Sequence, residues 1–217
     1  MHQIRRSMPK TWQIPRKAHP YITVARSSYP KNYSIALAIC VRDFLKLTQN
    51  ATESKKIIRA GEIEVNGRVI KDEKFGVGIL DIVHLKKLNK SYIMILTDKN
   101  DLALKETKDD SVKISKVIGK KVLNKNIMQI NLFGGKNILT KEKYNINDSL
   151  AIDLKKNQVL KVLPLKKDAH VFILAGKWKG NIAKVEGIKE NFAEIKLKNH
   201  STKVPIKNTI VVDKEKW

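Results

Sequence analysis

Apolar residues at helical spacing open the first regular stretch of the chain. The stretch begins near Ser34, a candidate N-cap, because a serine hydroxyl can accept a hydrogen bond from the first helical turn. Its apolar positions include Ile35, Ile39, Phe44, Leu45 and Leu47. A second helix is predicted over residues 52–60, where Gly61 fits the left-handed residue that commonly follows a helix. The chain therefore begins its folded part with two helices.

A β-hairpin is predicted directly after these helices. Within residues 62–70, two β-prone runs flank Asn66 and Gly67, and this pair suits a tight turn whose two central residues need positive φ. Residues 76–85 predict a further buried strand. The sequence GVG within it is a poor phosphate loop, since no third glycine or following helix supports it.

Short apolar runs separated by polar turns fill the rest of the chain. Residues 86–165 contain several such runs, which predict a small β-barrel or sandwich. Residues 166–217 contain five more. The expected fold class is α+β and multidomain. Its parts are a basic arm (1–33), a helical module (34–85), a β-rich central domain (86–165) and a C-terminal β-barrel (166–217).

Residues 1–33 differ from all of these parts. They hold seven basic residues and no acidic one, and their prolines (Pro9, Pro15, Pro20 and Pro30) forbid a long helix. Aromatic and basic residues alternate along them, which suits a strand that pairs phosphates while rings stack on bases. We expect an extended arm that is disordered alone and ordered when threaded into RNA. The alternatives are a flexible tail or an arm that packs on its own domain.

The net charge of the chain restricts the classes of function that fit the sequence. The 44 Lys and Arg outnumber the 21 Asp and Glu, for a formal net charge of +23, so the surface needs a polyanion. No apolar run approaches the roughly 20 residues of a membrane-spanning helix, and no secretory signal is recognisable, so a cytoplasmic protein is expected. The single cysteine, Cys40, is expected in the core and excludes cysteine-based metal clusters.

The two helices, the hairpin carrying VNGR and the closing GILDIVHL resemble the S4-type RNA-binding module. In that family the second helix and the hairpin present a basic face to RNA. The resemblance maps the face onto Lys55, Lys56, Arg59 and Arg68, with Lys71 and Lys74 just beyond them. By their spacing of four, Arg42 and Lys46 form a similar pair on the first helix. Helical spacing of three and four makes Lys55, Lys56 and Arg59 neighbours. The alternative is an ordinary solvated face.

Near the C-terminus, the stretch VFILAGKWKGNIAKVEGI resembles the KOW motif of a small SH3-like barrel. Gly176 and Gly180 take its loop positions, with Lys177, Trp178 and Lys179 at the tip. Glycines let a backbone approach a phosphate, and lysines supply the counter-charge. Ala183 departs from the glycine common in the motif. Trp178 could stack on a base or lie over its own barrel rim.

The order of these parts resembles the S4e family of small-subunit ribosomal proteins over essentially the whole chain. Local matches are HQIRRSMPKTW, VRDFL and KDEKFGVGILDIVHL, whereas SSYPKNYS departs from the family. Membership implies binding to small-subunit ribosomal RNA and to neighbouring ribosomal proteins, without catalysis, cofactor, metal or homo-oligomer. The arm residues expected at RNA are Arg5, Arg6, Lys10, Trp12, Arg16, Lys17 and Arg26. Heavy use of Lys, Ile and Asn and the lack of a long C-terminal extension favour a compact archaeal member.

Two other functions compete with this one. One is an RNA-modifying enzyme, such as a pseudouridine synthase or methyltransferase, with an accessory RNA-binding module. Against it, no glycine-rich cofactor loop or catalytic constellation follows the module. The other is a transcription elongation factor with a KOW module, which would explain only the last quarter of the chain.

Overall fold

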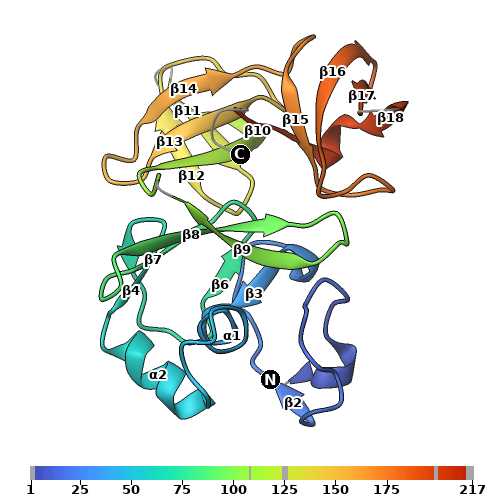
Figure 1. Ribbon diagram of the computed structural model, residues 1–217. Coiled ribbons are helices and arrows are strands. Elements are labelled where there is room, and N and C mark those ends of the chain that lie inside the picture. The colour runs from blue at the N-terminus through green and yellow to red at the C-terminus, as the bar shows by residue number, and fades with distance from the viewer. Residues whose placement is uncertain (1–2, 108, 124–126, 198–199, 214–217) are drawn as a thin grey trace. The chain divides into compact units, whose positions relative to one another are not determined.

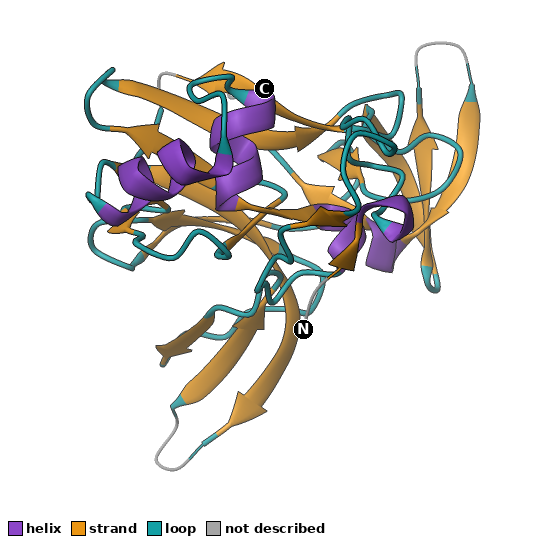
Figure 2. Ribbon diagram, turned by 90° about the horizontal axis from the view of Figure 1, so that it is seen from below, coloured by secondary structure: helices purple, strands orange, loops and turns teal. Residues whose placement is uncertain are grey.

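The computed structural model describes residues 3–107, 109–123, 127–197 and 200–213. The chain divides into two compact units, Met1–Lys113 and Ile114–Trp217. Figure 1 labels their elements, and strands dominate both units (Figure 2). The structure is therefore mostly β with few helices, and the helices lie in the first unit apart from one short 3-10 turn.

The N-terminal segment (residues 3–33) folds onto the rest of the first unit instead of extending from it. Its short elements are strand β1 (Gln3–Ile4), the 3-10 turn η1 (Arg5–Ser7), strand β2 (Tyr21–Ile22) and the 3-10 turn η2 (Lys31–Tyr33). Thr11 accepts a backbone hydrogen bond from Leu102 at 2.8 Å, and Arg26 donates one to Lys74 at 2.7 Å. The prolines do prevent a long helix, but the expectation of a free, extended arm is wrong for this structure. The alternative of an arm packed on its own domain describes it.

The first predicted helix begins at Leu37, two residues later than an N-cap at Ser34 would place it. Strand β3 (Ser34–Ala36) pairs with strand β6 (Gly76–Gly78), and Ile35 lies opposite Val77. Helix α1 (Leu37–Ile39) follows and runs into the π-helical turn η3 (Cys40–Phe44), with Ala36 in place of Ser34 at the N-cap. The β pairing uses the backbone that a helix from Ser34 would need. Cys40 is fully buried, as expected.

The second helix and the hairpin are as predicted. Helix α2 (Ala51–Arg59) is capped by Asn50, whose side chain accepts from the Glu53 N–H at 3.0 Å. Gly61 follows it at φ +76°, and Asn66 and Gly67 turn the hairpin at φ +52° and +72°. The first unit's five-stranded sheet has the order β5-β4-β7-β8-β9. Its strands are β4 (Ile63–Val65), β5 (Arg68–Val69), β7 (Ile82–Leu85), β8 (Lys90–Leu96) and β9 (Leu102–Thr107).

Among the described residues, the second unit contains two sheets of five strands each. The first has the order β12-β11-β10-β13-β14 and comprises β10 (Val112–Val122), β11 (Met128–Leu132), β12 (Asn137–Thr140), β13 (Ser149–Asp153) and β14 (Val159–Leu163). The second has the order β18-β17-β16-β15-β19. Its elements are β15 (His170–Ile173), β16 (Ile182–Lys189), β17 (Phe192–Lys196), β18 (Ser201–Pro205), the 3-10 turn η4 (Ile206–Asn208) and β19 (Thr209–Val211).

Each sheet of the second unit has an apolar interior. In the first sheet, Val117, Ile130 and Leu150 are fully buried and belong to one cluster with Tyr144. In the second, Val185 and Ile195 are fully buried and lie opposite each other on β16 and β17. The alternation predicted from the sequence therefore directs these residues inward.

Candidate nucleic-acid interface

Helix α2 and the hairpin after it place predicted basic residues side by side. Gly61 lies close to the outer strand, because a Cβ at this glycine would be 3.1 Å from Val69 Cγ1 and 3.7 Å from Lys71 Cε. The last turn of α2, which carries Arg59, therefore adjoins strand β5 and Lys71, which lies two residues after the end of that strand. Basic residues in the last turn of a helix also interact favourably with the helix dipole.

The basic residues around this junction differ in their acidic partners. Lys55 forms an ion pair with Glu73 at 3.3 Å. Nearby in the first unit, Arg42 is paired with Asp43 at 2.7 Å and Arg26 with Asp72 at 3.5 Å, while Lys74 is half-buried and Lys46 exposed. On helix α2 and in the hairpin region 62–71, the exposed basic residues Lys56, Arg59, Arg68 and Lys71 form no ion pair with any described residue. We call these four residues the basic face.

Two predicted contacts of the N-terminal segment lie inside the protein. The Arg5 side chain is buried and donates through Nε to the carbonyl of Pro15 at 2.5 Å. Trp12 is 4% exposed and donates through Nε1 to the carbonyl of Ser34 at 3.1 Å. Trp12 thus holds the segment to strand β3, and Arg5 ties together two parts of the segment, so we remove both side chains from the proposed RNA contacts.

Arg16 of the same segment is also occupied by the backbone. Its guanidinium, in a half-buried side chain, donates to the carbonyls of Arg6, Met8 and Pro9 at 2.9–3.1 Å. Lys10 and Lys17, like Arg6 and Arg26, stay exposed. Buried aromatic and arginine side chains therefore fix the conformation of the segment, and its other basic side chains remain on the surface.

The glycine-rich loop between β15 and β16 presents a second basic tip. Gly176 and Gly180 adopt φ +104° and +82°, as the turn requires. The Nζ atom of Lys177 lies 5.3 Å from the centre of the Trp178 ring, and that ring lies 5.9 Å from the ring of His200. Of the two possibilities for Trp178, the structure places it against its own unit. Lys177 is exposed and Lys179 half-buried.

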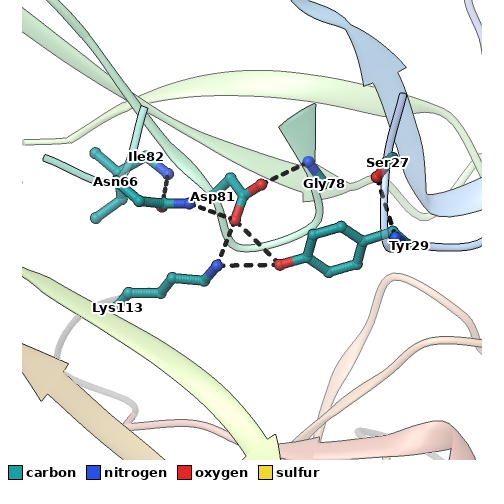
Figure 3. A network of polar contacts seen from close by, with 7 residues as sticks. All are labelled: Ser27, Tyr29, Asn66, Gly78, Asp81, Ile82 and Lys113. Atoms are coloured by element: carbon teal, nitrogen blue, oxygen red, sulfur yellow. Dashed lines mark hydrogen bonds and ion pairs between the residues drawn. The ribbon is translucent and has the colours of Figure 1, made fainter. Parts of the chain in front are cut away.

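A buried polar cluster, which the sequence analysis missed, stands behind the hairpin (Figure 3). The carboxylate of Asp81, 2% exposed, accepts from Tyr29 Oη at 3.1 Å, Asn66 Nδ2 at 2.9 Å and Lys113 Nζ at 2.5 Å. Its other oxygen accepts from the Gly78 N–H at 2.7 Å. A charged residue within the apolar run GILDIVHL was the signal that could have revealed it, because buried carboxylates need partners.

The charges in this cluster compensate one another. Burial alone would lower the pKa of Lys113, but the Asp81 carboxylate and the Tyr29 hydroxyl more than offset it, so the pKa is raised. Burial, and then the charge of Asp81, raise the pKa of Tyr29. Lys113 is therefore a cation, Asp81 its counter-ion and Tyr29 a neutral donor.

A serine, a histidine and an aspartate meet elsewhere in the first unit without the geometry of a catalytic triad. Ser91 Oγ lies 2.8 Å from His84 Nδ1, and Asp110 Oδ2 lies 3.6 Å from the same nitrogen. A relay needs the serine on one ring nitrogen and the carboxylate on the other. Among the described residues, no group of three or more His, Cys, Asp or Glu could hold a metal ion, and no helix is long and apolar enough to cross a membrane.

Fold and surface together define a β-rich protein with many exposed basic side chains. The model of ribosomal family S4e matches residues 88–159. The small ribosomal subunit protein eS4 of Archaeoglobus fulgidus is 36% identical over 189 residues, which cover 87% of this chain and 80% of that protein. The eS4 protein of Methanocaldococcus jannaschii is 34% identical over 85% of this chain and 80% of its own length.

A solved structure shares the fold. The crystal structure of the 30S ribosomal protein S4e from Thermoplasma acidophilum superposes with a TM-score of 0.72, at 21% identity, over 83% of this chain and 95% of that one. The chain belongs to ribosomal protein family S4e, and the relatives named here are archaeal, as expected. It is a structural protein of the small ribosomal subunit in the cytoplasm and not an enzyme, which sets aside both competing functions.

Proposed function

We propose that the protein binds and stabilises small-subunit ribosomal RNA mainly through the basic face, Lys56, Arg59, Arg68 and Lys71. The observation that carries this is the junction at Gly61, where the end of α2 adjoins the hairpin and the exposed cations have no ion pair among the described residues. Unpaired cations release counter-ions when they meet phosphates, whereas paired ones must first give up an acidic partner. Neighbouring small-subunit proteins are the other expected partners, and the protein enters the subunit as one copy.

The proposal also assigns roles to the parts of the chain. Residues 34–85 act as the S4-type RNA-binding module and residues 166–217 as the KOW barrel. Of the β-rich part at 86–165, strands β8 and β9 extend the sheet of the module, and strands β10 to β14 form the central sheet. The strand order of the last sheet and the positive-φ glycines at 176 and 180 support the barrel assignment. Residues 1–33 add the exposed cations of the N-terminal segment to the RNA surface. Lys55, Arg42, Lys46 and Lys74 contribute at its margin.

The role of the basic face is tested by neutralising its four residues and comparing the result with an equal loss of charge elsewhere. We expect the variant with Gln at Lys56, Arg59, Arg68 and Lys71 to bind small-subunit RNA at least tenfold more weakly than wild type at about 0.1 M salt. The slope of log affinity against log salt should fall by up to about 3.6, since each of four phosphate contacts contributes roughly 0.9. The measurement is filter binding or fluorescence anisotropy over a salt series, with folding checked by circular dichroism.

A control variant carries the same loss of charge elsewhere. Lys141, Lys143, Lys155 and Lys156 are exposed residues of the second unit, and their replacement by Gln also removes four positive charges. If the control weakens binding as much as the first variant, net charge alone explains the affinity, and the basic face is not a defined site.

A further inference from the structure

We infer that Asp81 is a positioning residue for the RNA-binding hairpin, acting through Asn66 on Arg68. This rests on the proposed function of the basic face. Arg68 lies on β5, a two-residue edge strand that pairs only with β4 among the described strands. So short a pairing leaves the direction of the arginine weakly determined, because edge pairs of this length carry few ladder hydrogen bonds.

The side chain of Asn66 supplies the missing constraint. Its Nδ2 donates to Asp81 at 2.9 Å, and its Oδ1 accepts from the Ile82 N–H at 3.1 Å. The backbone N–H of Asn66 also donates to the Ile82 carbonyl at 2.8 Å. Positive φ explains why asparagine suits this turn, but glycine would satisfy that need equally well. The amide therefore has a second role, which is to fasten the turn to a buried carboxylate.

The same carboxylate also fastens the N-terminal segment. Tyr29 donates to Asp81, and its ring lies where a Cβ at Gly78 would overlap it. Lys113 neutralises the cluster and bonds both Asp81 and Tyr29. Figure 3 shows these side chains converging on Asp81 from separate parts of the chain. One buried anion thus holds both the turn before Arg68 and the segment that follows Arg26.

A substitution at Asn66 can disturb the position of Arg68 without changing the net charge of the protein. Asn66→Gly keeps the backbone conformation and the net charge and removes only the amide, so electrostatics alone predicts unchanged RNA affinity. Positioning predicts a loss of roughly three- to tenfold, a part of what one well-placed arginine contributes. Asn89→Gly is the matched control, because Asn89 also occupies a turn at φ +47°. It should bind like wild type.

A double-mutant cycle with Arg68→Ala shows whether Asn66 acts through the arginine. The probe is full-length small-subunit ribosomal RNA, at a temperature where every variant is folded. We expect Asn66→Gly to weaken binding in the wild-type background and to have no further effect in the Arg68→Ala background. Equal effects in both backgrounds would overturn the inference, because the amide would then act independently of Arg68.

The Asp81 end of the contact is tested by Asp81→Leu with Lys113→Met, which removes the acceptor of the Asn66 amide and the buried ion pair without changing the net charge. We expect the same loss of affinity as for Asn66→Gly, and wild-type affinity would contradict the inference. If Asn66→Gly binds normally while Arg68→Ala binds weakly, the inference fails and the basic face stands. If Arg68→Ala itself binds like wild type, Arg68 does not contribute to the basic face, and the inference is also wrong.

Discussion

Two buried lysines on strand β10 show how the partner decides the charge of a side chain. Lys113 lies 2.5 Å from the Asp81 carboxylate, which raises its pKa despite burial. Lys116 has no carboxylate partner within the described residues, and its Nζ donates to the carbonyls of Ile206 at 2.5 Å and Thr209 at 2.8 Å. Carbonyl dipoles compensate a buried charge less than a carboxylate does. Burial therefore lowers the pKa of Lys116 to about 8.

This shift predicts a pH dependence of stability. An unfolded lysine titrates near 10.4, so between pH 8 and that value the unfolded chain binds the Lys116 proton more than the folded protein does. The contribution of Lys116 to the free energy of unfolding should therefore rise with pH across this window, by up to about 2 kcal/mol. We expect Lys116→Met to lose the rise. Urea unfolding at pH 7.5, 8.5 and 9.5 measures it, as the difference between wild type and variant.

The control for Lys116 lies on the same strand. Lys121 is exposed, so Lys121→Met should follow the wild-type pH dependence. If Lys116→Met and wild type keep a constant difference from pH 7.5 to 9.5, the amine in the folded protein does not titrate in this window. The carbonyls of Ile206 and Thr209 would then stabilise the charged form of Lys116 as well as water does.

At the scale of elements, local chemistry predicted helix α2 and the hairpin after it, and long-range pairing decided the elements that were predicted wrongly. Gly61 and the pair at 66–67 indicate the end of α2 and the hairpin turn through positive φ, which is visible in sequence. The cap at Asn50 has equally local chemistry, although it was not predicted. Ser34 also has the chemistry of an N-cap. It enters strand β3 because β6, some forty residues later, offers a partner.

The N-terminal segment escaped prediction for a related reason. Its prolines and charges are typical of a disordered arm. The burial of Trp12 and Tyr29, however, depends on surfaces provided much later in the chain, such as the glycines of β6. Gly76 and Gly78 lack the Cβ atoms that would overlap Ser27 and Tyr29. The sequence GVG thus has a packing role, which no local pattern indicates.

The loop between β15 and β16 can be tested as an RNA contact in its own right. Replacing Lys177 and Lys179 with Gln should weaken RNA binding severalfold and reduce the salt slope by up to about 2, because two phosphate contacts are lost. Filter binding over a salt series measures both quantities. Lys184→Gln with Lys196→Gln is the control in the same sheet, since these lysines are paired with Asp168 and Glu186. Equal effects of both pairs would show that the loop has no special contact.

At the scale of the whole molecule, an excess of 23 positive charges affects folding and binding in opposite directions. Like charges repel in the compact state, and salt screens this repulsion. Surface ion pairs such as Lys90–Glu106 and Lys189–Glu194 weaken in salt, but each is worth only about 0–1 kcal/mol. The repulsion involves every unpaired cation at once. We therefore expect repulsion to outweigh the pairs.

The free protein should accordingly become more stable as salt rises, while its affinity for RNA falls. We expect the midpoint of urea unfolding to increase between about 20 mM and about 300 mM NaCl, the range in which the Debye length shrinks from roughly 20 Å to 6 Å. The variant with Gln at Lys141, Lys143, Lys155 and Lys156 carries four fewer charges and should show a smaller increase. A midpoint that falls with salt would mean that the surface ion pairs dominate. A rise of equal size in both proteins would point instead to anion binding at a particular site, such as the basic face, which this variant leaves intact.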